Sequence, residues 1–328
     1  MDYRAFVVSE DDSGSFEAEL KTLHSGDLPA GDVLIRVGYS SLNYKDALSF
    51  SGNKGVTRKF PHTPGIDAAG QVLSSNDVSF KVGEDVLVVG YDLGMNTRGG
   101  FGEIISVPKE WVIRLPKNLS LSECMAWGTA GFTAALCVKK LLQNGLTKEQ
   151  GPVLVSGASG GVGSVATMLL NKLGFEVHAL TSKVEHTDFF DSIGASKVVA
   201  LADFMEQPAR PMLKSIYSSA IDVAGGEVLA TMVKCIKYGG SVACCGLVDS
   251  ISLNTTVLPF ILRGINLLGV DSVELPLSEK QDMWNTVADE WSLPELEGNC
   301  QIIGPELLDQ SLRLILAGQA KGRFILKH

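Results

Sequence analysis

The chain has 328 residues, 45% of them hydrophobic, and a formal net charge of −9 at pH 7. The length predicts two domains, and the acidic charge argues against a nucleic-acid partner. No apolar run reaches the length of a membrane span, and the first residues show no signal-peptide pattern, so we expect a cytoplasmic protein. The six cysteines form no Cys-x-x-Cys pair, which predicts buried free thiols and neither a zinc site nor a disulfide framework.

The first 115 residues predict a strand-rich domain, a partly closed barrel. Alternating or clustered apolar residues lie between glycine and proline turn signals at residues 3–8, 32–37, 64–72, 82–89 and 104–107.

Two stretches of this domain are candidates for function. Residues 39–48 pass from small polar side chains into a short helix and gather Asn43, Tyr44 and Asp46. The loop at residues 51–70 is basic, so it is either a solvated loop or a surface that attracts a phosphate-bearing substrate. The basic residues in and beside it are Lys45, Lys54, Arg58 and Lys59.

Residues 152–183 predict a strand, a glycine turn, a helix and a second strand. Four glycines lie within seven residues of the turn, and helical spacing follows over 164–173. Such a turn lets backbone amides approach a pyrophosphate at the positive end of the helix. The pattern predicts a dinucleotide-binding unit, with a turn that only reverses the chain as the alternative.

The tip of the second strand indicates which dinucleotide binds. An NAD site has an acidic residue there, whereas this chain has Thr181, Ser182 and Lys183. Hydroxyls and an ammonium suit a 2′-phosphate, which predicts NADPH. The alternative is a solvated turn at the end of the strand.

Strand and helix patterns alternate through the rest of the chain. This alternation predicts an α/β protein with a doubly wound parallel sheet. The last predicted strand of that sheet, 265–270, would form an edge, and a long apolar edge needs a cover, so we expect a homodimer. Two helices at 119–144 precede the sheet, and the tail, with helices at 278–291 and 305–317 and a strand at 323–327, is expected to return to the first domain.

With these elements placed, the chain resembles the medium-chain dehydrogenase/reductase superfamily. Within it, the chain is similar to the zinc-free quinone oxidoreductase group, in the acryloyl-CoA reductase branch of YhdH/YhfP type. The resemblance implies a GroES-like catalytic domain of residues 1–120 and 274–328 and a Rossmann domain of residues 121–273. The motifs that carry it lie at residues 41–48, 64–67, 128–134, 157–164, 255–263 and 269–273.

The resemblance also implies a reaction and a set of contacts. Relatives in this branch reduce acryloyl-CoA to propanoyl-CoA with NADPH. Zinc-dependent relatives carry Gly-His-Glu where this chain has Gly65, Ile66 and Asp67, and cysteine where it has Asn43, so no catalytic zinc is expected. Lys197 stands where the family has arginine, which keeps the charge and loses bidentate binding. The implied cofactor contacts are Tyr44, Ser159, Gly160, Gly161, Val162, Thr181, Ser182, Lys183, Lys197, Leu247, Ile261 and Ser272.

Reduction of an unsaturated carbonyl builds negative charge on its oxygen and later needs a proton at the α-carbon. Tyr44 is the first candidate donor, and its alternative role is packing with a contact to the cofactor alone. Asn43 and Asp46 either position Tyr44 or cap the local helix. Arg323 either pairs with a cofactor or substrate phosphate or lies on the surface.

Three functions compete at this point. The first is an NADPH-dependent enoyl-thioester reductase, which the basic loop favours because coenzyme A carries phosphates. The second is an NADPH-dependent reductase of quinones or small enones. The third is a non-catalytic NADPH-binding protein, which the polar residues from Asn43 to Asp46 argue against.

Overall fold

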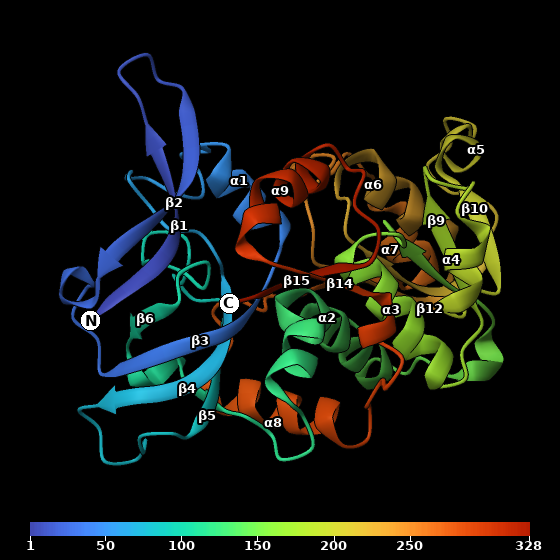
Figure 1. Ribbon diagram of the computed structural model, residues 1–328. Helices are drawn as coiled ribbons and strands as arrows, with labels where there is room; N and C mark the ends of the chain where they lie inside the picture. Colours follow the sequence, from blue (N-terminus) through green and yellow to red (C-terminus); the bar gives the residue numbers. More distant parts are fainter. The chain divides into compact units, whose positions relative to one another are not determined.

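The computed structural model describes all 328 residues and divides into two compact units (Figure 1). The terminal unit contains Met1–Thr129 and Ser272–His328, and the central unit contains Ala130–Asp271. None of the helices is both long and apolar enough to cross a membrane.

The terminal unit is built on strands, as the sequence predicts. An antiparallel hairpin of β1 (Asp2–Glu10) and β2 (Phe16–His24) stands apart as a two-stranded sheet, blue in Figure 1. The larger sheet has the order β14-β15-β3-β4-β5-β7, and β6 pairs with the first half of β3. Its strands are β3 (Val33–Ser41), β4 (Asp67–Ser75), β5 (Asp85–Val89), β6 (Ile104–Val107), β7 (Ile113–Arg114), β14 (Cys300–Ile303) and β15 (Arg323–Lys327).

The tail of the chain completes this sheet. β15 has the predicted bounds and pairs antiparallel with the end of β3, which confirms that the tail returns to the first strands. β14 was not predicted and pairs parallel with β15. The helices of this unit are α1 (Tyr44–Phe50), α8 (Leu277–Ala288) and α9 (Leu308–Leu316), and α9 lies beside α1 (Figure 1).

The central unit is one parallel sheet in the order β10-β9-β8-β11-β12-β13. The chain starts in the middle at β8, winds out to β10, and then crosses to β11 and winds out to β13. This order confirms the predicted doubly wound sheet and places β13 at its edge. The strands are β8 (Val153–Ser156), β9 (Val177–Thr181), β10 (Lys197–Ala200), β11 (Tyr217–Asp222), β12 (Ile236–Cys244) and β13 (Asn266–Gly269).

Alternating helices accompany these strands. α5 and α7 were not predicted, because each is shorter than two turns and shows no apolar period. The helices are α3 (Gly161–Lys172), α4 (Thr187–Ser192), α5 (Leu201–Met205), α6 (Gly226–Cys235) and α7 (Leu258–Arg263).

The two helices predicted at 119–144 are present as the two halves of α2 (Leu121–Gln143), which meet at a break. The break is at Gly128, whose φ of 49° lies in the left-handed region that favours glycine. A Cβ at this position would meet the hydroxyl of Ser41 and a carboxylate oxygen of Asp67. The break therefore brings the α2 backbone next to two polar side chains of the terminal unit.

Candidate functional site

The glycine turn of the central unit has the geometry of a phosphate cradle. Gly157 has a φ of 57°, and a Cβ on Gly163 would lie 2.3 Å from the carbonyl oxygen of Gly157. Only glycine at 163 therefore lets α3 pack this close to the turn. The helix begins behind Gly160, and no side chain caps it, so its first amides point outward for a ligand.

The helix α3 starts at Gly161, three residues before the predicted start at 164. The difference has a simple cause, since the first turn is made of Gly161, Val162 and Gly163 and offers almost no apolar spacing. The predicted contacts Ser159 and Gly160 lie in the turn itself, and Ser159 is buried.

A buried aspartate next to the turn was missed by the sequence reasoning. Asp222 ends β11, beside β8, where the direction of winding reverses. Its carboxylate accepts hydrogen bonds from Ser156 Oγ at 2.9 Å and from the amide of Gly225 at 2.8 Å. Burial raises the pKa of Asp222. The signal that could have identified it is a carboxylate at the end of an apolar strand, followed closely by two glycines.

The tip of β9 lies at the same edge of the sheet. Thr181 is the last residue of the strand, and its hydroxyl accepts a hydrogen bond from the amide of Lys183 at 3.0 Å. Ser182, between them, is exposed. The structure therefore groups Thr181, Ser182 and Lys183 in one short turn.

Lys197 does not join this group. It is the first residue of β10 and pairs with His178, whereas Ala200 pairs with Thr181. Three residues of strand, about 10 Å, separate the two levels of the sheet. Leu247 and Ile261 are well exposed in the central unit, at 60% and 68%.

The terminal unit contains a second candidate, a buried polar cluster centred on Asp67 at the start of β4. One carboxylate oxygen accepts hydrogen bonds from Ser41 Oγ and from Asn43 Nδ2, the latter at 2.8 Å. The break in α2 adds the amide and the hydroxyl of Thr129, at 2.8 and 2.5 Å. All of these donors bind the Asp67 carboxylate, which is fully buried.

Asp46 is a second buried carboxyl in this cluster. Its oxygens accept hydrogen bonds from the amides of Asn43 at 2.8 Å, Gly65 at 3.1 Å and Ile66 at 2.8 Å. Burial and the neighbouring charge of Asp67 raise the pKa of Asp46 to about 7, against these backbone donors. Asp46 thus ties the start of α1 to the segment that precedes β4, so it does more than cap a helix.

The structure contradicts both positions expected for Arg323, on the surface or beside a phosphate. The side chain is neither on the surface nor free for a phosphate, since it is only 2% exposed. Its guanidinium donates to the carbonyl oxygens of Ala126 at 3.1 Å and Leu42 at 3.3 Å and lies 3.4 Å from Asn43 Oδ1. Burial lowers the pKa of Arg323, and the charge of Asp67 opposes that effect.

The remaining predicted residues lie in different surroundings. Tyr44, the first residue of α1, is 36% exposed, and Ser272 is buried. In the basic loop, Lys54 forms an exposed ion pair with Glu10. Its ammonium also lies over the rings of Phe16 and Phe60.

Comparison with known proteins identifies the class. Residues 29–117 match the family model "Alcohol dehydrogenase GroES-like domain", and residues 161–290 match "Zinc-binding dehydrogenase". The chain is 42% identical over 327 residues to the acrylyl-CoA reductase AcuI of Ruegeria pomeroyi, covering 98% of both chains. It is also 42% identical over 325 residues to the putative quinone oxidoreductase YhfP of Bacillus subtilis, again covering 98% of both.

Solved structures agree with this relationship. The YhdH oxidoreductase of Salmonella enterica in complex with NADP matches with a TM-score of 0.95 and 39% identity, over the whole of both chains. The Bacillus subtilis protein yhfP with NAD bound matches with a TM-score of 0.96 and 40% identity, also over both full chains. The protein is therefore an oxidoreductase of the medium-chain dehydrogenase/reductase class. Within that class it belongs to the family of the YhdH/YhfP-type acrylyl-CoA reductases.

The second family model is named for zinc. At the positions where zinc-dependent relatives carry cysteine and Gly-His-Glu, the residues of this chain do not suit that ion. Asn43 and Ile66 offer an amide and an alkyl chain, and Asp67 already accepts four hydrogen bonds. The structure has no group of three or more histidine, cysteine, aspartate and glutamate side chains that could hold a metal.

Proposed function

We propose that this protein reduces the C=C bond of an α,β-unsaturated acyl thioester with NADPH, and that acryloyl-CoA, giving propanoyl-CoA, is its substrate. The observation that carries the proposal is the 42% identity to an acrylyl-CoA reductase over 98% of both chains. Reduction of quinones or small enones is the second candidate, which the name of the Bacillus subtilis relative favours.

NADPH supplies the hydride in this proposal, and the central unit holds it. The uncapped start of α3 faces the pyrophosphate with its free amides, and the missing side chain at Gly163 keeps that helix close to the turn. Thr181, Ser182 and Lys183 supply two hydroxyls and an ammonium to the 2′-phosphate. The absence of an acidic side chain in this turn leaves nothing to repel that phosphate.

The terminal unit acts on the substrate. The hydroxyl of Tyr44 donates a hydrogen bond to the thioester oxygen as negative charge builds there. The first turn of α1 carries Tyr44, and the three backbone hydrogen bonds to Asp46 fix that turn. Asn43 is fixed in turn by Asp67, so Asn43 and Asp46 position the donor and do not themselves transfer a proton.

The substitution Y44F tests this role. Loss of a donor to a developing oxyanion lowers kcat by roughly 10²–10³-fold and leaves the KM for NADPH almost unchanged. If Tyr44 contacts the cofactor alone, the KM for NADPH rises and kcat at saturation stays near the wild-type value. Steady-state kinetics with NADPH varied at saturating acryloyl-CoA separate the two results.

The basic loop supports a coenzyme A thioester over a quinone, although less strongly than its sequence suggests. Lys54 is engaged by Glu10, which leaves Arg58 and Lys59 as the exposed charges of the loop outside an ion pair. These two side chains are proposed to attract the phosphates of coenzyme A.

Assays of NADPH consumption decide between the candidate functions. Acryloyl-CoA, crotonyl-CoA, a benzoquinone and a free enone are compared, each with NADPH and with NADH. Turnover confined to the thioesters and NADPH supports the proposal. Faster turnover of the quinone replaces it by the second candidate, and tight NADPH binding without any turnover indicates a non-catalytic binding protein.

Two further features belong to the proposal. We expect a homodimer through the edge strand β13, where Leu267 is 37% exposed, and light scattering tests it. A cytoplasmic location fits the six free cysteines. Three of them are buried as predicted, namely Cys124, Cys137 and Cys235, whereas Cys244, Cys245 and Cys300 are only partly buried.

A further inference from the structure

A lysine with no solvent access lies in the terminal unit, on the first turn of α8. The ammonium of Lys280 donates to the carbonyl oxygens of Val89 and Val273, both at 2.8 Å. A buried charge costs several kcal/mol of desolvation, and an apolar residue of similar volume in such a place is often as stable or more so. Stability alone therefore does not explain a lysine at this position.

The ammonium also holds a backbone in a rare conformation. Tyr91 has a φ of 53°, and it is the only residue other than glycine in the chain with a positive φ. Lys280 Nζ lies 3.4 Å from the centroid of its ring, and Trp111 stacks on the ring with centroids 5.6 Å apart. The Tyr91 amide donates to Val273 O and its hydroxyl to Leu275 O, both at 3.2 Å. Strain that is held by so many contacts is typical of functional regions.

The two carbonyl groups that Lys280 binds belong to two parts of the candidate site. Val89 is the cross-strand neighbour of Asp67, the centre of the buried polar cluster, and the next amide, Gly90, donates to Ile66 O at 3.1 Å. Val273 directly follows Ser272, a predicted cofactor contact. One ammonium thus connects the strand that flanks the polar cluster to the segment that carries Ser272.

We propose that Lys280 is a positioning residue that fixes the segment of Ser272 and Val273 relative to the polar cluster around Asp67. The inference rests on the proposed function, because it takes Ser272 as a contact of NADPH. Without the ammonium, Val273 loses its hydrogen bond to Lys280, and the strained turn at Gly90 and Tyr91 loses the cation that lies over the Tyr91 ring. The segment then samples positions in which Ser272 no longer meets the cofactor.

The substitution K280M tests the inference, since methionine fills most of the same volume without a charge. We expect the Kd for NADPH, measured by calorimetry, to rise roughly tenfold, as when supporting contacts of a site are removed. At saturating NADPH, kcat should stay within about twofold of the wild type, because the positioned contact serves cofactor binding. E279M is the matched control, since it removes an exposed charge from the same turn of α8, and it should change neither constant.

A folded K280M protein with wild-type Kd overturns the inference and leaves the proposed function intact. Failure of the wild-type protein to bind NADPH refutes the proposed function first. If K280M does not fold, K280Q decides, because the shorter, neutral amide cannot reach both carbonyl oxygens as the ammonium does. A weaker Kd in folded K280Q supports the inference, and an unchanged Kd overturns it.

Discussion

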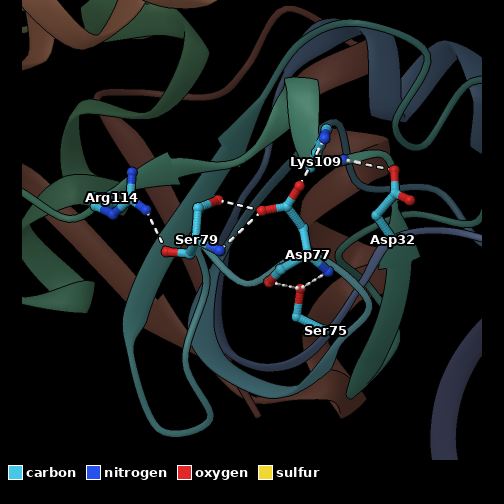
Figure 2. Close-up of polar contacts among 6 residues, drawn as sticks. All are labelled: Asp32, Ser75, Asp77, Ser79, Lys109 and Arg114. Atoms are coloured by element: carbon cyan, nitrogen blue, oxygen red, sulfur yellow. Dashed lines mark hydrogen bonds and ion pairs between the residues drawn. The ribbon is translucent and has the colours of Figure 1, made fainter.

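The terminal unit contains two clusters of carboxylates that differ mainly in their access to water. The cluster around Asp67 and Asp46 is buried together with Arg323. The second cluster, drawn in Figure 2, lies in the turn between β4 and β5, where Asp77 accepts from Lys109 Nζ at 2.6 Å and from Ser79. Its flanking contacts join Lys109 to Asp32 and Arg114 to Ser79.

The pKa of an aspartate shifts in opposite directions in the two clusters. Burial and a like charge raise the pKa of Asp46 to about 7. The hydrogen bonds from Lys109 and Ser79 lower the pKa of Asp77 well below its ordinary range. The difference shows that a carboxylate network alone does not indicate a functional site. What distinguishes the first cluster is that its charges are desolvated and cannot be screened by water or salt.

The largest expected effect is that of D67A. The substitution removes the acceptor of Ser41, Asn43 and Thr129. It also removes the charge of Asp67, which opposes the effect of burial on Arg323. We expect a loss of roughly 3–5 kcal/mol in the free energy of unfolding, typical of leaving a buried charge uncompensated. Urea denaturation at pH 7 measures it.

D77A is the control for D67A, because it removes a carboxylate with a comparable number of donors from a partly exposed site. Its urea midpoint should lie much closer to that of the wild type. Equal shifts in the two variants would contradict the distinction between the clusters.

A smaller effect is expected for D46N, and it depends on pH. The pKa of Asp46 is about 7 in the folded protein against an ordinary 3.8. The folded state therefore binds the proton more tightly, and the stability gained from it is present at low pH and lost as pH rises through about 7. Asparagine does not titrate, so this loss between pH 5 and pH 8 should disappear in the variant.

D46N should also carry a constant loss at every pH. Its NH₂ group cannot accept from the backbone amides that Asp46 binds, which costs about 1–3 kcal/mol. Urea midpoints at pH 5 and pH 8 for the wild type and D46N separate the pH-dependent loss of stability from the loss that is present at every pH. Parallel pH profiles would show that Asp46 does not titrate in this range.

The sequence predicted the central unit better than the site in the terminal unit. The glycine turn, the tip of β9 and the winding of the sheet depend on local signals, namely glycine spacing and alternating apolar periods. Even there, a parallel register decides which strand ends meet. That is why Lys197, which the resemblance placed among the cofactor contacts, lies about three residues from the level of Thr181.

The polar cluster depends on contacts between distant parts of the chain. Asn43 and Asp46 stood out as polar residues near one another, but Asp67 reaches Thr129 only because Gly128 breaks α2. Arg323 is brought to the cluster by the pairing of β15 with β3, which no local pattern indicates. An arginine after a glycine looks the same in sequence whether it is exposed or buried, so its place was predicted wrongly.

The smallest expected effect concerns the second cluster, where Asp77 pairs with Lys109. Because the pKa of Asp77 is lowered, its contribution to stability is present above the ordinary carboxyl pKa of 3.8 and is lost as pH falls below it.

The Asp77–Lys109 pair is partly solvated, so 1 M salt should weaken it, whereas the buried cluster should be almost insensitive. K109M should therefore lower the urea midpoint slightly at low salt and not at high salt, while the deficit of D67A should persist at both. A K109M deficit that also persists in 1 M salt would mean that the exposed cluster acts through packing, and charge screening would then not distinguish the two regions.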